Sequence, residues 1–159
     1  MIRLVGALLI LSASVTLGSA AAHMYRRRVW QLDAFYALIS HIGAQIDGFL
    51  LPLDRIYADF HSRELEDCGF LALLREYGGE RALALCRSLV LTGDELEELT
   101  KFFSGLGHHA ADEELRHCAY FEKRIGAMVS QAREQLAKKG KLCRALGALF
   151  GILCTVILI

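Results

Sequence analysis

The fold is decided by the last third of the chain, residues 112–159, which read DEELRHCAYFEKRIGAMVSQAREQLAKKGKLCRALGALFGILCTVILI. In the first half of this stretch, apolar residues recur three and four positions apart, and on a 3.6-residue helix they form one continuous stripe. Charged residues such as Lys123 and Arg133 fall on the opposite side. The stretch therefore predicts one long amphipathic helix. Its stripe consists of Leu115, Cys118, Phe121, Ile125, Met128, Val129, Ala132 and Leu136.

The same stretch changes character after Leu136, where cations gather and charge then ends. Residues 145–159 contain no charged side chain. A basic collar followed by an apolar terminus is typical of a helix that enters a bilayer. The collar consists of Lys138, Lys139, Lys141 and Arg144.

The start of the chain repeats this pattern in mirror image. Residues 4–24 contain no Lys, Arg, Asp or Glu, and Arg26, Arg27 and Arg28 follow directly. Because basic collars stay on the cytoplasmic side, we predict membrane spans at 2–24 and 142–159 and a cytoplasmic helical domain at 25–141. Small residues recur at a spacing of four within both predicted spans. This spacing would let the two spans pack on each other or on another protein, and the formation of a homo-oligomer is a further alternative.

The amino-terminal segment also resembles a cleavable signal peptide. Arg3, the apolar run 4–17 and the small residues 19–22 have the expected order. The alternative function is then a secreted helical binding protein. We favour the membrane span, because three arginines directly after the apolar run resist export and the second collar obeys the same charge rule.

Composition sets the class of the domain. The 159 residues carry 18 basic and 18 acidic side chains, so no net field attracts nucleic acid. One proline and 54% hydrophobic residues indicate an all-α fold. The five cysteines follow no CxxC spacing, and we interpret them as reduced, mostly buried residues.

Breaks in the helical pattern divide the chain into six helices. Pro52 ends the first, Gly78 and Gly79 end the third, and Thr92 with Glu95 forms a capping box that opens the fifth. Short glycine turns between helices favour an antiparallel bundle whose first and last helices continue into the membrane. The expected helices cover residues 2–50, 53–60, 70–77, 82–91, 93–103 and 108–159.

One histidine-rich cluster has the residue types of a metal site. His109, Glu113 and His117 share a helix face, but the HExxH order is absent and acidic residues at a helix start already suit its dipole. We therefore predict no metal, no cofactor and no catalytic residue, and the chain is not expected to be an enzyme. The full cluster is His108, His109, Asp112, Glu113 and His117.

A second candidate is a surface that binds a partner protein. The acidic run at the start of the fifth predicted helix suits the helix dipole, and it could also dock a basic surface. The proline turn is the other exposed candidate. The predicted partner-binding residues are Pro52, Leu53, Asp94, Glu95, Glu97 and Glu98.

Three segments resemble the stage III sporulation protein AB family: IDGFLLPL at 46–53, FSGLG at 103–107 and KLCRALGALFG at 141–151. The longer FGxxLG turn of the family is shortened here, and AADEE at 110–114 stands where the family usually carries Asp and Gln. The family is itself similar to the cytoplasmic domain of type II secretion F platform proteins.

The resemblance implies a non-enzymatic platform subunit of a transenvelope channel between mother cell and forespore, which supports late forespore gene expression. It implies a seat in the outer forespore membrane, with the helical domain in the cytoplasm. Its expected partners are a cytoplasmic ring ATPase, the sporulation AA protein, and other subunits of the same complex.

Overall fold

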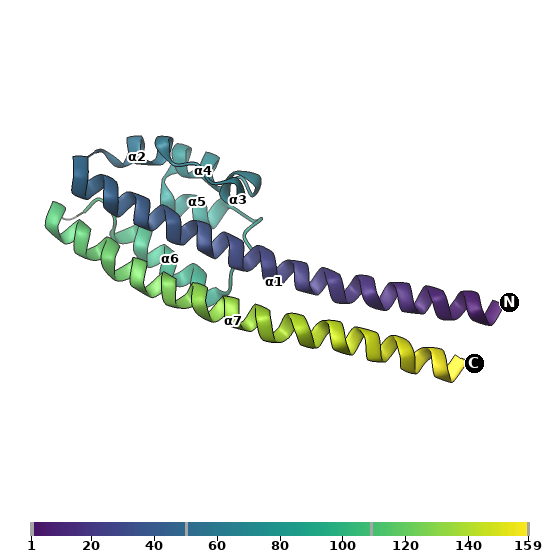
Figure 1. Ribbon diagram of the computed structural model, residues 1–159. Helices are drawn as coiled ribbons and strands as arrows, with labels where there is room; N and C mark the ends of the chain where they lie inside the picture. The colour runs from purple at the N-terminus through teal and green to yellow at the C-terminus, as the bar shows by residue number, and fades with distance from the viewer. Residues whose placement is uncertain (1, 50, 109, 159) are drawn as a thin grey trace. The chain divides into compact units, whose positions relative to one another are not determined.

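The computed structural model describes the backbone of residues 2–49, 51–108 and 110–158, and the side chains of residues 23–48, 51–108 and 110–138. Over these residues the chain is entirely helical, as expected, with seven helices and no strand (Figure 1). The helices are α1 (Ile2–Phe49), α2 (Leu53–Asp59), α3 (Arg63–Asp67), α4 (Phe70–Tyr77), α5 (Gly79–Leu85), α6 (Gly93–Gly105) and α7 (Ala111–Leu158).

The chain divides into two compact units. The first consists of Met1–Arg27 with Ala132–Ile159, and the second is Arg28–Gln131. Among the described residues, no helix is long and apolar enough to cross a membrane. The predicted spans at 2–24 and 142–159 lie outside the residues whose side chains are described, apart from 23 and 24. The spans stay predictions.

Within the second unit, α1 and α7 run antiparallel. The Tyr36 hydroxyl donates to Glu122 at 3.3 Å, and its ring lies against Gly126. Further along α1, Gly43 lies against Cys118, which comes earlier in α7. Later residues of α1 therefore contact earlier residues of α7, as in an antiparallel bundle.

Helix α6 packs beside α7, also antiparallel to it. Arg124 donates to Glu98 at 3.2 Å, while His117, earlier in α7, contacts Phe102, later in α6. The four short helices α2 to α5 complete the unit, with α4 in contact with α2, α3 and α5, and α5 in contact with α6. The predicted helical bundle is confirmed at this level.

Aromatic rings join the helices into one core. The Phe35 and Phe70 ring centroids lie 4.8 Å apart, edge to face, and Phe70 lies 6.2 Å from Phe103. Phe102 lies 5.6 Å from Phe121. Such pairs stabilise beyond the area that they bury. The core therefore draws on α1, α4, α6 and α7.

Two helices differ from the sequence prediction. Helix α3 was not predicted, because Leu65 is the one apolar residue in its sequence RELED. The helix predicted at 82–91 instead ends at Leu85. The predicted end at residue 91 is wrong because the buried side chain of Gln31 bonds the backbone beyond the helix. It accepts from the Val90 amide at 2.7 Å and donates to the Ser88 carbonyl at 3.2 Å, and these bonds hold residues 86–92 as a loop.

The cysteines within the described side chains are buried free thiols, as expected: Cys68, Cys86 and Cys118. Burial raises the pKa of the Cys118 thiol to about 11, so it stays protonated near neutral pH. The Cys86 thiol donates to the Cys68 carbonyl at 3.3 Å. Cys143 and Cys154 lie outside the residues whose side chains are described.

Candidate functional site

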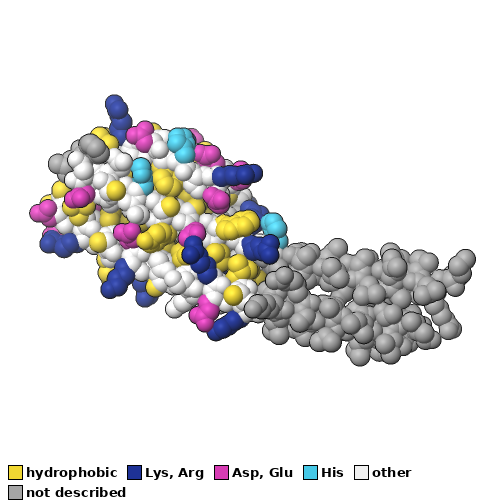
Figure 2. Space-filling view, in the orientation of Figure 1, with side chains coloured by type: hydrophobic (Ala, Val, Ile, Leu, Met, Phe, Trp, Pro, Cys, Tyr) yellow, Lys and Arg dark blue, Asp and Glu magenta, His cyan; other side chains and the backbone are white. Residues whose placement is uncertain are grey.

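The second unit has two ends that differ in construction. We call them the Arg28 end, formed by Arg28, Glu95 and the loop 86–92, and the Pro52 end, formed by the turns at Pro52 and Gly107. Residues 28 to 49 of α1 connect them over about 30 Å at 1.5 Å per residue. On the face of this unit shown in Figure 2, hydrophobic side chains are exposed among charged side chains of both signs.

A buried ion pair holds the Arg28 end together. The Arg28 guanidinium donates from Nη2 to Glu95 Oε1 at 2.7 Å and from Nε to Oε2 at 3.0 Å. Glu95 is only 3% exposed, and its Oε2 also accepts from the Thr92 amide at 2.8 Å. Both halves of the predicted capping box are present. The Glu95 carboxylate therefore caps the start of α6 and bonds α6 to α1.

The electrostatics of Glu95 follow from this geometry. Burial alone raises the pKa of its carboxyl, but the hydrogen bonds from Arg28 and Thr92 outweigh burial. The net pKa lies below the ordinary value, so Glu95 is charged at neutral pH.

Both residues of this pair have a predicted role. Glu95 was predicted to bind a partner and Arg28 to belong to the membrane collar, and both roles stay predictions. Their side chains are 4% and 17% exposed, respectively, and each is the partner of the other. The helical pattern gave no signal for this contact because the two residues are 67 positions apart.

The remaining acidic residues of α6 differ in accessibility. Glu98 pairs with both Lys101 and Arg124, and its side chain is 14% exposed. Glu97 pairs with Lys101 at 2.7 Å but stays exposed, and Asp94 is also exposed. Only Asp94 and Glu97 therefore present carboxylates at the surface.

The collar residues within the described side chains are mostly exposed. Arg26 and Arg27 are exposed, and Lys138 pairs with Glu134 at 2.6 Å. Lys139, Lys141 and Arg144 lie outside the residues whose side chains are described.

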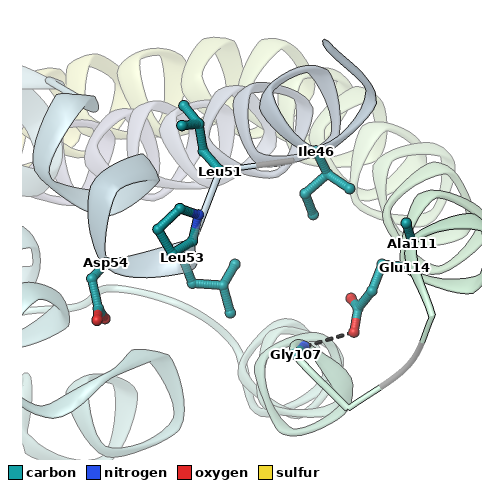
Figure 3. Close-up of a pocket in the computed structure, with 8 residues that line it drawn as sticks. Ile46, Leu51, Leu53, Asp54, Gly107, Ala111 and Glu114 are labelled. Atoms are coloured by element: carbon teal, nitrogen blue, oxygen red, sulfur yellow. Dashed lines mark hydrogen bonds between the residues drawn. The ribbon is translucent and has the colours of Figure 1, made fainter. Parts of the chain in front are cut away.

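The Pro52 end contains an open hollow of about 380 Å³ (Figure 3). Ile46 and Leu53 point into the space between α1, α2 and the start of α7, while Asp54 lies at its edge and points away. The predicted residues Pro52 and Leu53 both line it. The lining residues are Ile46, Leu51, Pro52, Leu53, Asp54, Gly107, Ala111 and Glu114.

The turn at Gly107 needs glycine. Its φ of +87° lies in the left-handed region, and a Cβ there would lie 3.1 Å from Leu53 Cδ1. The Gly107 amide donates to Glu114 Oε1 at 2.7 Å, and Glu114 is 6% exposed. The first turn of α7 thereby fixes the turn that precedes it. Glu114 was not predicted to take part, because a carboxylate at a helix start has an ordinary explanation in the dipole.

The hollow brings together two of the three segments on which the family resemblance rests. Ile46 and Leu53 are the first and last residues of IDGFLLPL, and Gly107 ends FSGLG. These segments are more than fifty positions apart in the sequence. A mainly apolar lining of this kind suits an apolar side chain of another protein.

The residues of the partner-binding prediction do not form one surface. Pro52 and Leu53 lie at the Pro52 end, whereas Glu95 lies at the Arg28 end. Helix α6 carries the chain from one end to the other, from Gly93 to Gly105. Two separate candidate surfaces result.

The described histidines of the cluster, His108 and His117, have different surroundings. His117 Nε2 lies 3.0 Å from the Phe102 carbonyl oxygen, and its ring stacks on Phe102 with centroids 5.5 Å apart. His108 is exposed, and His109 lies outside the described residues. In the described part of the chain, no three His, Cys, Asp or Glu side chains are arranged to hold a metal ion.

The fold and the two ends define a class: a small helical protein with an open hollow at one end of its second unit and an ion pair between helices at the other. The model of the stage III sporulation protein AB family matches residues 79–159, which is half of the chain. The chain therefore belongs to the stage III sporulation protein AB family, and its role is connected with sporulation. No curated protein and no solved structure matches it.

Proposed function

We propose that this chain is a non-enzymatic platform subunit of the sporulation channel between mother cell and forespore. Family membership supports the sporulation role. The family is one of assembly proteins and has no known enzymatic activity. The subunit would support late forespore gene expression by holding other parts of the channel in place.

In this proposal the two apolar ends seat the chain in the outer forespore membrane. The sequence supports this arrangement through its two collars, which follow one charge rule at both ends. The helical domain then faces the mother-cell cytoplasm. A cytoplasmic ring ATPase, the sporulation AA protein, would dock on it.

The docking surface that we propose is the hollow at the Pro52 end. The observation that carries this choice is that two distant segments of the family resemblance meet there. The hollow is open, its lining is mainly apolar, and Pro52 and Asp54 are exposed beside it. By contrast, the acidic run of α6 has committed Glu95 and Glu98 to partners within the chain.

The test compares the two surfaces in the full chain, purified in a mild detergent and incubated with the purified ring ATPase. One variant carries Pro52→Ser with Asp54→Lys, and the other carries Asp94→Lys with Glu97→Lys. All four side chains are exposed. Because Pro52 precedes α2 and Asp54 lies in its first turn, circular dichroism first checks that each variant keeps the helix content of the original chain. Glu95 and Glu98 stay unchanged because their loss would disturb packing.

We expect the variant at the hollow to weaken ATPase binding by about tenfold or more, the scale of one well-packed contact residue. The variant on α6 should bind within about twofold of the original chain. The opposite result would move the docking surface to the start of α6. Unchanged binding by both variants would exclude both surfaces.

The alternative, a secreted helical binding protein, is separated from this proposal by one measurement. The mass of the protein purified from its native host shows whether residues 1–22 remain. A chain shortened at that point would contradict the membrane platform.

A further inference from the structure

Apolar side chains are exposed at the Arg28 end. Leu85 ends α5 and is 53% exposed, and Leu96 in the first turns of α6 is 37% exposed. The loop between them contains Leu89, Val90 and Leu91 in succession, each only half-buried. We call these five residues the 85–96 patch. They lie within one segment of chain, in which Arg87, Ser88 and Asp94 are also exposed.

The 85–96 patch is fixed rather than loose. Gln31 bonds both Ser88 and Val90, as described above, and Arg28 holds the start of α6 through Glu95. The protein thus fixes a loop that contains three half-buried apolar residues beside Gln31 of α1.

That level lies close to the predicted membrane boundary. Gln31 follows Arg28 by three residues, or about 4.5 Å along α1. The polar interface of a bilayer is about 5–8 Å thick on each side. Trp30, a residue type that prefers this interface, is 51% exposed at the same helical turn.

We propose that the 85–96 patch lies on the lipid surface, with Leu89, Val90 and Leu91 inserted among the headgroups. This inference rests on the membrane seat of the proposed function. The second unit would then touch the bilayer with its Arg28 end as well as being tethered to it. Its tilt would be limited, and the Pro52 end would be held toward the cytoplasm.

Burial of apolar surface, more than charge, provides the attraction. Arg87 in the loop is exposed and suits anionic headgroups, but the exposed carboxylates of Asp94 and Glu97 stand nearby in sequence and oppose it. Zwitterionic lipid should therefore be contacted as well as anionic lipid. Added salt should change the contact little.

Fluorescence quenching by brominated lipid tests the proposal directly. The chain contains a single tryptophan, Trp30, so a Trp30→Phe background can carry one new indole. The probes are Leu85→Trp and Leu96→Trp, each placed in that background. The full chain is reconstituted in vesicles of phosphatidylethanolamine and phosphatidylglycerol, with bromine near the headgroup end of the acyl chains.

A matched control is Tyr120→Trp in the same background. Tyr120 is 62% exposed on α7, three residues after His117, which contacts the later half of α6 and not the Arg28 end. We expect both patch probes to be quenched at least about twofold more strongly than the control, as for side chains at the interface. Equal quenching of the probes and the control would overturn the proposal. A blue-shifted but unquenched Leu85→Trp probe would also overturn it, because protein and not lipid would then cover the patch.

The original chain separates this inference from the proposed function. Quenching of Trp30 without quenching of either patch probe would remove the lipid contact and leave the membrane seat standing. An unquenched Trp30 would contradict the membrane seat as well.

Discussion

The two ends of the second unit join the same helices by different means. At the Arg28 end, a buried carboxylate and an amide side chain make directional bonds, from Glu95 to Arg28 and from Gln31 to the loop. At the Pro52 end, a proline and a left-handed glycine set the chain direction, and packing leaves a hollow. Directional bonds fix one arrangement, whereas turns and packing leave surface for another molecule. In the proposed function, the Arg28 end would orient the unit and the Pro52 end would bind the partner protein.

The largest effect should follow from Glu95→Ala at the Arg28 end. The change removes the capping box and leaves a guanidinium with little exposure beside a vacated acceptor. We expect a loss of about 3 kcal/mol in the free energy of unfolding, as for a broken buried pair. The measurement is a urea titration of the full chain in mild detergent, followed by Trp30 fluorescence.

Glu97→Ala is the matched control, because Glu97 is exposed on the same helix. It should change stability by less than about 0.5 kcal/mol. A comparable loss in both variants would mean that the helix, rather than the ion pair, determines the stability of this end.

A smaller effect is expected from Gly107→Ala at the Pro52 end. An alanine at φ +87° costs about 1–2 kcal/mol, the penalty of a side chain in the left-handed region. Its control is Gly48→Ala near the end of α1, where a Cβ would meet nothing within 4 Å. That control should be neutral or up to about 1 kcal/mol more stable, because alanine favours a helix. Equal destabilisation of the two variants would contradict the prediction, because Gly48 has neither a positive φ nor a close neighbour.

The smallest and most specific effect is a pH dependence that only the Arg28 end should show. Since the folded pKa of Glu95 is lowered, its charged form stabilises the fold above the unfolded-state pKa, and that contribution is lost as the pH falls through the folded pKa. Glu95→Gln retains an acceptor for Thr92 but not the charge.

The stability difference between the original chain and Glu95→Gln should therefore be constant near neutral pH and narrow below the ordinary glutamate pKa of 4.5. Parallel urea titrations at several pH values measure it. A stability difference that widens toward acid pH would contradict the lowered pKa of Glu95.

Local rules predicted much of this fold. Pro52 ends α1 and begins α2, and Thr92 caps α6 with Glu95, because both effects act within one helical turn. The sequence did not predict α3, whose single buried leucine makes no stripe. It also placed the end of α5 too late, because the Gln31 side chain that holds the loop comes from more than fifty positions away.

The candidate site could be predicted only in part. Pro52 and Leu53 were expected at a surface and do line the hollow, but no pattern could bring Gly107 beside them. The burial of Glu95 could not be predicted, because an acidic residue in the first turn of a helix gives the same sequence pattern whether it is exposed or paired. The contact with Arg28 depends on how α1 and α6 pack, which periodicity does not specify.

The aromatic contacts of the core join the two halves of the chain. The family match begins at Gly79, yet Phe103 packs on Phe70, and Phe70 packs on Phe35. A fragment starting at Gly79 would keep the matched sequence and lose half of its interior. We therefore expect the matched half of the chain not to fold without the residues that precede it.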